Sequence, residues 1–169
     1  MRDFALRPAT QEDLPFLREM LYEAVHWPPE RGEKPPPEEV FSAPEMRRYL
    51  EGWGRPGDAG FIAVAGGGER VGAAWRRLMT AREPGYGFVD ERTPEVAVAV
   101  APEARGRGVG SALVEALISS ARLSGCEALS LSVDDRDNRA VSLYRRLGFR
   151  TVEERESDAL MKLDLKQSD

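Results

Sequence analysis

A glycine-rich turn near the middle of the chain has the residue types and spacing that bind a phosphorylated ligand. Residues 96–114 read VAVAVAPEARGRGVGSALV, so an alternating apolar segment leads into glycines at positions 106, 108 and 110 and then into a helical pattern. Glycine lets the backbone approach a ligand closely. The first N–H groups of a helix lack partners within the helix, and the helix dipole favours an anion there. The turn therefore predicts a phosphate-binding site.

Other interpretations of this turn can be weighed from the same residues. A nucleoside-triphosphate loop requires a lysine after its last glycine, and no lysine lies near Gly110, so that class is excluded. A dinucleotide fold stays open as an alternative, because Gly106 and Gly108 follow a strand and Asp134 ends the next strand. Against it, Ser111 occupies the third glycine position, and residues 109–169 are too few to complete a doubly wound sheet.

The elements that must position the turn follow from apolar periodicity. Alternation predicts strands at about 3–7, 61–65, 71–79, 95–100, 128–133 and 159–165, and helical spacing predicts helices at about 14–25, 44–51, 109–124 and 138–147. Three consecutive glycines at 66–68 predict a hairpin, so the first half of the sheet is antiparallel. Residues 95–133 form a parallel β-α-β unit. Prolines and glycines make 27–44 and 80–94 long loops, and Asn138 can cap the last helix.

Composition and length predict one cytoplasmic domain. The 169 residues are 41% hydrophobic, enough for a single core, and no shift in composition marks a second domain. The net charge of −5 comes from interspersed acids and arginines, which argues against nucleic acid as a partner and agrees with an amine substrate. The lone Cys126 and lone His26 support neither a disulfide framework nor a metal site. No signal peptide and no run of about 18 apolar residues is present, so no membrane interaction is expected.

Two motifs give the chain a family resemblance. Residues 105–110 read RGRGVG, and residues 138–149 read NRAVSLYRRLGF. The first resembles the acetyl-CoA motif of the GCN5-related N-acetyltransferase (GNAT) superfamily, Arg/Gln-x-x-Gly-x-Gly/Ala. The second resembles that family's Asn-x-x-Ala/Ser-x-x-x-Tyr-x-x-x-Gly-Phe, with the alanine at 140 instead of 141. The resemblance covers about residues 95–152, whereas the first ninety residues match only in the order of their elements.

The resemblance implies a fold and a division of the chain. The fold is α/β (α+β), with a mostly antiparallel central sheet of six to seven strands, about four flanking helices and a parallel β-α-β unit that binds acetyl-CoA. Residues 1–169 form a single N-acetyltransferase domain. Within it, 1–94 are the substrate-side half, 95–152 the acetyl-CoA-binding core and 153–169 the C-terminal strand.

The resemblance also implies which residues bind acetyl-CoA, the co-substrate, with no metal. The backbone amides of residues 107–112 hold the pyrophosphate, and the side chains of Arg105 and Arg107 either reinforce them or remain solvated. Val98 and Val100 pair with the pantetheine arm as a neighbouring strand would. Asn138 contacts the cofactor or a catalytic water. The complete set of predicted cofactor-binding residues is Val98, Val100, Arg105, Arg107, Gly108, Val109, Gly110, Ser111, Ala112 and Asn138.

Acetyl transfer to an amine needs a base, an oxyanion partner and an acid. The resemblance assigns the acid to Tyr144, whose alternative is a core position on an apolar helix face. It places the oxyanion partner at the N–H of Val98. Glu95 is the predicted base, acting through water, and its alternative is a solvated strand end. On the proline-rich loop, His26 is a second candidate base, although a packing or exposed role fits it better, as it does Trp27.

The expected activity is direct acetyl transfer from acetyl-CoA to a primary amine. The acceptor is a small molecule, a protein N-terminus or a lysine, and the sequence does not choose among them. Asp90 and Glu91 precede the central strand and offer a clamp for a cationic substrate. A homodimer is possible. The alternative function is a noncatalytic acyl-CoA-binding or sensing module of the same fold, against which Tyr144 argues.

Overall fold

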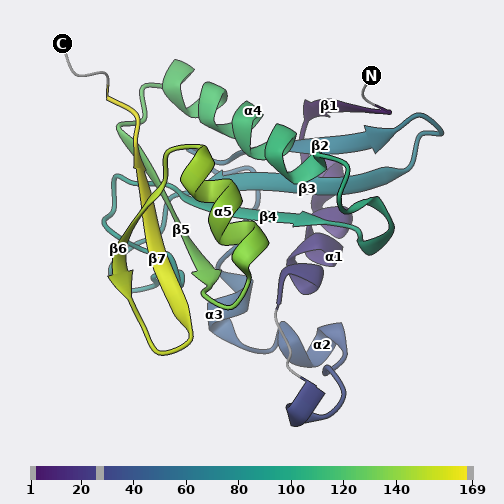
Figure 1. The fold of residues 1–169 in the computed structure, drawn as a ribbon, viewed down its shortest axis with the longest axis horizontal. Helices are drawn as coiled ribbons and strands as arrows, with labels where there is room; N and C mark the ends of the chain where they lie inside the picture. Colours follow the sequence, from purple (N-terminus) through teal and green to yellow (C-terminus); the bar gives the residue numbers. More distant parts are fainter. Residues whose placement is uncertain (1–2, 26–28, 167–169) are drawn as a thin grey trace.

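The computed structural model describes residues 3–25 and 29–166, which form one sheet with helices on both faces (Figure 1). The strands are β1 (Phe4–Pro8), β2 (Ala59–Ala65), β3 (Arg70–Arg77), β4 (Glu95–Val100), β5 (Ala128–Asp134), β6 (Arg150–Glu154) and β7 (Asp158–Asp164). The α-helices are α1 (Leu14–Ala24), α2 (Pro37–Val40), α3 (Pro44–Arg47), α4 (Val109–Leu123) and α5 (Asn138–Arg146). Short 3₁₀ turns occupy Gln11–Asp13, Pro29–Arg31 and Pro102–Ala104. In these ranges, none of the helices has the length and apolar character that a bilayer crossing requires.

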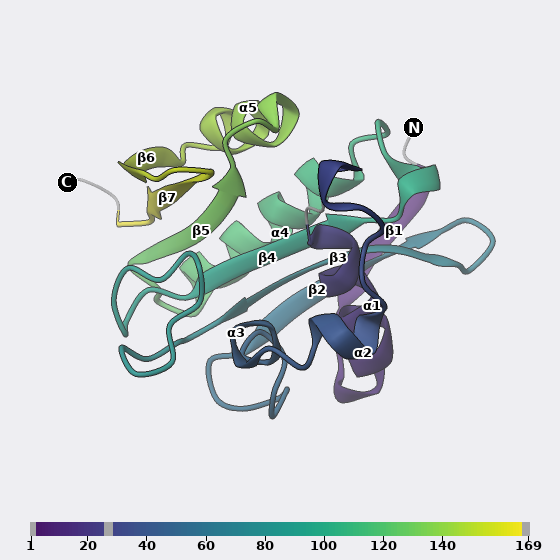
Figure 2. The ribbon, with the colours of Figure 1, turned by 90° about the horizontal axis from the view of Figure 1, so that it is seen from below.

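The strand order of the seven-stranded sheet is β1-β2-β3-β4-β5-β7-β6. All neighbouring strands are antiparallel except β4 and β5, which α4 connects in the parallel sense. Helices α1, α2 and α3 lie on one side of the sheet, and α4 and α5 lie on the other (Figure 2). The architecture confirms the expected mixed, mostly antiparallel sheet with one β-α-β unit.

Two apolar clusters hold the helices against opposite faces of the sheet. One contains the fully buried Leu113 of α4 together with Tyr144 of α5, and the other contains the fully buried Leu17 of α1. Strand β4 contributes to both because successive side chains alternate between faces. Val98 packs with the α4 cluster, whereas Ala97 packs with the α1 cluster. By the same alternation, the side chain at position 95 lies on the α1 face of the sheet.

The sequence missed two elements for physical reasons. Helix α2 is a single turn that begins with Pro37 at its first position, where proline costs no hydrogen bond, so prolines did not make this whole segment a loop. Strand β6 is a short edge strand whose residues are mostly exposed, so it lacks the alternation that identifies a half-buried strand. The helix expected at 44–51 is α-helical only at Pro44–Arg47 and continues as turns.

A buried ion pair fastens the segment after α3 to strand β3. The guanidinium of Arg77 donates to both carboxylate oxygens of Asp58, at 3.0 and 2.7 Å, and both side chains are almost fully buried. The same guanidinium donates to the carbonyls of Arg48 and Glu51. The indole of Trp75 donates to the carbonyl of the intervening residue 49 at 3.1 Å. These bonds hold residues 48–51 against β3, next to the start of β4.

Replacing Asp58 with alanine is expected to lower the free energy of unfolding by about 3 kcal/mol, because it leaves a buried guanidinium without its counter-charge. Urea denaturation of the parent and variant measures the difference. Asp164→Ala is the matched control, since Asp164 pairs with Arg150 at the surface and exposed pairs contribute little. Equal losses in the two variants would contradict the structural role given to the buried pair.

Candidate active site

The turn before α4 presents a row of backbone N–H groups. Gly106 and Gly108 have φ values of +79° and +82°, in the left-handed region that favours glycine, and a Cβ at either would meet nothing within 4 Å. Among the described residues, no hydrogen bond uses the N–H groups of residues 106–111. The N–H of Ala112, which we expected to join them, donates to the carbonyl of Gly108 at 3.1 Å. With the positive end of the α4 dipole beside it, this row can hold an anion.

The first turn of α4 contains three more of the predicted residues. Val109 is buried, and Gly110 and Ser111 are half-buried. A Cβ at Gly110 would lie 3.6 Å from Val100 Cγ2, an ordinary contact, and Gly110 does not have a positive φ. Unlike the two preceding glycines, this position therefore needs glycine neither for its backbone conformation nor to avoid a collision within the protein.

The two arginines of the turn are largely exposed and have acidic neighbours. Arg107 Nη1 lies 3.3 Å from Asp3 Oδ2. Arg105 Nη2 lies 3.8 Å from Glu23 Oε2, while its Nε donates to the carbonyl of Val100 at 3.2 Å. Both guanidinium groups are exposed, so a phosphate could replace the carboxylate and accept the same charge-assisted hydrogen bonds.

Strands β4 and β5 separate almost as soon as they meet. Their pairing consists of Glu95 with Ser130, next to a hydrogen bond from the Ser130 N–H to the Pro94 carbonyl at 3.0 Å. The strands then diverge toward their carboxyl ends, as Figure 2 shows. Because backbone groups alternate along a strand, those of Val98 and Val100 point to the same side of β4 as the Pro94 carbonyl, toward β5. An extended ligand arm can pair with β4 at these two residues.

Glu95 lies at the point where the two strands part, and its side chain is only 3% exposed. Its Oε1 accepts hydrogen bonds from the Tyr49 hydroxyl at 2.5 Å and from the Gly87 N–H at 2.7 Å. Its Oε2 is buried and makes no hydrogen bond in the described part of the chain. Burial raises the pKa of Glu95 to about 7, although both hydrogen bonds and the charge of Arg155 act to lower it. This carboxyl can therefore take up and release a proton near neutral pH.

Tyr144 occupies the buried face of α5. Its ring packs edge-on against Phe149, with 5.7 Å between the ring centroids. Tyr144 belongs to the apolar cluster that also contains Val98 and Val100 of β4. Burial, and to a smaller extent the charge of Asp137, raises the pKa of the Tyr144 phenol above its ordinary value. The phenol therefore stays protonated at neutral pH, so its packing position is compatible with the predicted acid role, which remains a prediction.

The expected capping role of Asn138 is wrong. The N-cap of α5 is Asp137, whose carboxylate accepts a hydrogen bond from the Ala140 N–H at 3.0 Å. Either residue type can cap a helix, and a carboxylate one residue earlier also interacts favourably with the helix dipole. Asn138 is the exposed first residue of the helix, so its amide side chain stays available to a ligand.

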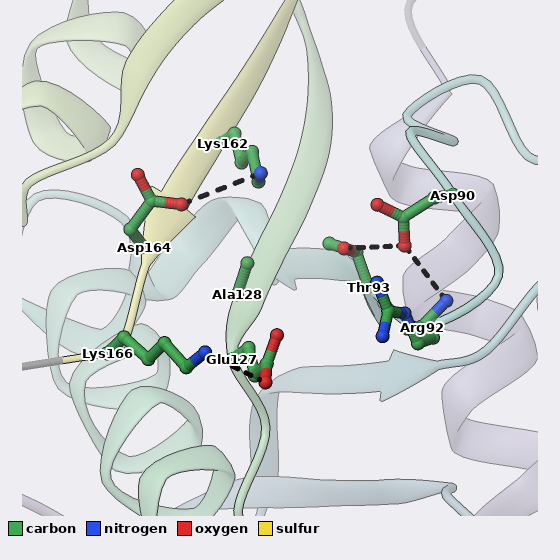
Figure 3. A pocket seen from close by; sticks show the side chains of 8 residues that line it. All are labelled: Asp90, Arg92, Thr93, Glu127, Ala128, Lys162, Asp164 and Lys166. Atoms are coloured by element: carbon green, nitrogen blue, oxygen red, sulfur yellow. Dashed lines mark hydrogen bonds and ion pairs between the residues drawn. The ribbon is translucent and has the colours of Figure 1, made fainter.

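The acids proposed as a substrate clamp lie before the amino end of β4, whereas the glycine turn follows its carboxyl end. Asp90 accepts hydrogen bonds from the Arg92 N–H and the Thr93 hydroxyl, and Glu91 accepts one from the Ala81 N–H. Asp90 lines a surface pocket at the amino ends of β4 and β5, whereas the two strands diverge toward their carboxyl ends (Figure 3). The pocket residues are Asp90, Arg92, Thr93, Glu127, Ala128, Lys162, Asp164 and Lys166. His26 and Trp27 lie outside the described residues. In the ranges 3–25 and 29–166, no group of three or more His, Cys, Asp or Glu is arranged to hold a metal ion.

Sequence reasoning missed the residues that surround Glu95. Tyr49 comes from the segment after α3, and residues 85–87 come from the loop between β3 and β4. A Cβ at Gly85 would overlap Glu95 Oε2, and a Cβ at Gly87 would lie 2.7 Å from the backbone of β5. The Gly-Tyr-Gly sequence at 85–87 was the available clue, since two glycines that close together suggest a close backbone approach.

Comparisons with known proteins show which family and fold the chain resembles. The family model described as "Acetyltransferase (GNAT) family" matches residues 19–149. A mycothiol acetyltransferase from Pseudarthrobacter chlorophenolicus is 41% identical over 103 residues, which cover 60% of this chain and 30% of that protein, so the chain spans about a third of that relative's length.

Two solved structures extend the similarity over the whole fold. The ribosomal-protein-alanine N-acetyltransferase from Brucella melitensis is 26% identical, with a TM-score of 0.68, over 95% of this chain and 99% of that one. A phosphinothricin acetyltransferase from Sinorhizobium meliloti, solved in complex with acetyl-CoA, is 21% identical, with a TM-score of 0.68, over 96% and 89% of the two chains. The free N–H row, the diverging strands and the family match over most of the chain lead to one conclusion: this chain belongs to the GNAT acetyltransferase family.

Proposed function

We propose that this protein transfers an acetyl group directly from acetyl-CoA to a primary amine. The observation that carries the proposal is the buried Glu95 carboxyl, which has one oxygen free and lies where β4 and β5 part. A free alkylamine with a pKa near 10.4 is neutral in only about one molecule in a thousand at pH 7.4, so a base that removes its proton is valuable. A carboxyl with a pKa raised to about 7 is a stronger base than an ordinary glutamate.

The residues present fit acetyl-CoA, which supplies an acetyl group activated as a thioester. The unpaired N–H groups of residues 106–111 would hold its pyrophosphate, and Arg105 and Arg107 would add positive charge. The backbone of Val98 and Val100 would pair with its extended arm. Bound in this way, acetyl-CoA would present its acetyl group beside β4, the strand that begins with Glu95.

The chain's own groups then account for every proton in the reaction. The amine nitrogen forms a bond to the acetyl carbon as the carbon–sulfur bond breaks. Glu95 Oε2 accepts the proton that the amine gives up, through a water molecule, and the N–H of Val98 donates to the oxygen that becomes negative. Tyr144 donates its phenolic proton to the departing thiolate sulfur, and the second proton that the nitrogen loses as the amide forms restores the phenol. The side chain of Asn138, exposed at the start of α5, is a further contact for the cofactor or the water.

The acceptor is an amine that the substrate-side half of the chain selects. Names of the relatives include mycothiol, ribosomal-protein alanine and phosphinothricin acetyltransferases, so the family accommodates several unlike acceptors. The 41% identity to a mycothiol acetyltransferase favours a small-molecule amine over a protein N-terminus or lysine.

The test is release of free CoA thiol from acetyl-CoA by the purified protein, measured with a thiol-reactive dye against a panel of amino acids, polyamines, amino sugars and short peptides. We expect release that depends on one class of amine. Tight acetyl-CoA binding with no amine-dependent release from any member would instead support the noncatalytic acyl-CoA-binding module.

Replacing Tyr144 with phenylalanine is expected to lower kcat by about 10²-fold, the small end of the range for acid–base catalysis, because a thiolate is a good leaving group. Acetyl-CoA affinity should not change, because the ring that packs against Phe149 is retained. Steady-state kinetics with titration calorimetry separate the two effects. Unaltered kcat would leave Tyr144 with a packing role alone.

A further inference from the structure

We infer that Tyr49 is a positioning residue that fixes which oxygen of Glu95 accepts the substrate proton, an inference that rests on the proposed function of Glu95 as base. Tyr49 is 8% exposed. Its hydroxyl donates to Glu95 Oε1 at 2.5 Å and accepts a hydrogen bond from the Tyr86 N–H at 2.9 Å. Because the hydroxyl has a donor already pointing at it, its own proton is directed to the carboxyl and not elsewhere.

Residues 85–87 hold this arrangement from the opposite side. The Gly87 N–H donates to the same Glu95 oxygen, while the Gly87 carbonyl accepts from the Ser130 hydroxyl at 2.6 Å. The Tyr86 carbonyl accepts from Arg155 Nη2 at 2.5 Å. Both N–H groups and both carbonyls of Tyr86 and Gly87 are therefore bonded to side chains from four separate elements. A loop anchored at four points cannot easily turn its N–H groups away from the carboxyl.

The two carboxyl oxygens of Glu95 are consequently not equivalent. Oε1 accepts two hydrogen bonds from donors that are held in place, whereas Oε2 is buried and accepts none in the described residues. Oε2 lies against Gly85, where a Cβ would overlap it. A proton taken from the substrate therefore goes to Oε2, on the side where Gly85 has no side chain.

The charged and titratable groups around Glu95 determine what loss of the Tyr49 hydroxyl does. Arg155 reaches over from the end of β6 and favours the ionised carboxyl. Arg77, opposite Glu95 on β3, has its charge matched by Asp58, and Lys162 of β7 lies 3.5 Å from Asp164. Neither of these last two pairs involves Tyr49. The Tyr86 phenol is partly exposed, and its partial burial and the charge of Glu45 raise its pKa, so it stays neutral near pH 7.

These contacts predict the direction in which the pKa of Glu95 shifts when the Tyr49 hydroxyl is removed. The Tyr49 hydrogen bond stabilises the ionised carboxyl. Without this bond, less stabilisation offsets the cost of burying the charged form of Glu95. In Tyr49→Phe, the pKa of Glu95 should therefore rise by about one pH unit, the size expected for one hydrogen bond to a charged group. Substituting 3,5-difluorotyrosine, a stronger hydrogen-bond donor with nearly the same shape, should move the pKa in the opposite direction.

The experiment is a carbon-13 NMR titration of the Glu95 carboxyl in protein labelled at glutamate, with Glu95→Gln identifying the resonance. It needs no acceptor. Tyr22→Phe is the matched control, because the Tyr22 hydroxyl donates a partly buried hydrogen bond to the Pro35 carbonyl and makes no hydrogen bond to Glu95. We expect the midpoint to rise in Tyr49→Phe, to fall with difluorotyrosine and to stay at the parent value in Tyr22→Phe.

The outcomes separate the inference from the proposed function. A midpoint that fails to move in opposite directions in the two Tyr49 proteins overturns the positioning role, whatever Glu95 does in catalysis. If Tyr49→Phe does not fold, the fluorinated protein alone still decides, since a purely structural tyrosine would give no fall. If the two midpoints shift in opposite directions but Glu95→Gln transfers acetyl groups as fast as the parent, the Tyr49 hydrogen bond to Glu95 is supported. In that case Glu95 is not the base, and the proposed function of Glu95 is wrong.

Discussion

Replacing Glu95 with glutamine is expected to reduce kcat/KM for acetyl transfer by about 10³-fold at pH 8, within the range that loss of a general base produces. Glutamine keeps the size of the side chain and can still accept the hydrogen bonds of Tyr49 and Gly87 through its carbonyl oxygen. It cannot accept a proton at the second position. The loss should therefore appear in the rate, while acetyl-CoA affinity measured by titration calorimetry stays at the parent value.

The dependence of the rate on pH gives this prediction a second readout. With a pKa of about 7, the Glu95 carboxyl is ionised in roughly nine molecules in ten at pH 8 and in one in ten at pH 6. Parent activity should rise through an inflection near pH 7, and Glu95→Gln should lack that inflection. The ratio of parent to variant rates should be large at pH 8 and small at pH 5.5, and an inflection that persists in the variant would belong to another group.

Stability provides the control for this variant. The pKa of Glu95 is raised from 4.5 in the unfolded chain to about 7 in the fold, so the folded state holds its proton more tightly. That contribution to stability is complete below pH 4.5 and is lost as pH rises to 7. Glu95→Gln has no carboxyl to ionise, so its free energy of unfolding should lack this fall, and urea denaturation at pH 5 and pH 8 measures the difference. A variant that loses activity because it unfolds would instead be less stable than the parent at both pH values.

The geometry of the turn that we propose binds acetyl-CoA was predictable because its residues are neighbours in the sequence. Strand β4 has the predicted bounds, since alternating valine and alanine between two prolines leaves few other possibilities. The glycine turn and α4 come next in the sequence, and glycines mark both ends of this helix. Gly108 is the N-cap with a positive φ, and Gly125 also has a positive φ, just after the helix ends.

The environment of Glu95 was not predictable for the converse reason. Tyr49 is 46 residues away from Glu95 along the chain, and it is positioned by the bonds that Arg77 and Trp75 make to its segment. Periodicity reports which face of a strand a residue occupies, but it does not report which distant loop covers that face. The sequence therefore allowed two roles for Glu95, a catalytic base or a solvated residue at a strand end. Only the three-dimensional structure shows that it is buried.

Replacing Gly108 with glutamate is expected to weaken acetyl-CoA binding by more than about 10²-fold, to the point where titration calorimetry detects no heat. The added carboxylate lies at the N–H row of residues 106–111 and competes with the anion that the row would bind. It also repels that anion. A side chain at this φ of +82° adds a backbone cost of about 1–2 kcal/mol. The parent should bind acetyl-CoA and give no heat with NAD, whereas binding of NAD alone would restore the dinucleotide interpretation.

Gly125→Glu separates the two causes of that loss. Gly125 has a φ of +81° and, like Gly108, no atom within 4 Å of where a Cβ would lie, but it follows the carboxyl end of α4 and not the amino end. Both variants therefore carry a similar backbone cost and the same added charge, at opposite ends of one helix. If strain or net charge were responsible, both would lose acetyl-CoA binding. If the N–H row holds the pyrophosphate, Gly125→Glu binds as the parent does and only Gly108→Glu fails, because only there does the carboxylate occupy the place of the phosphate.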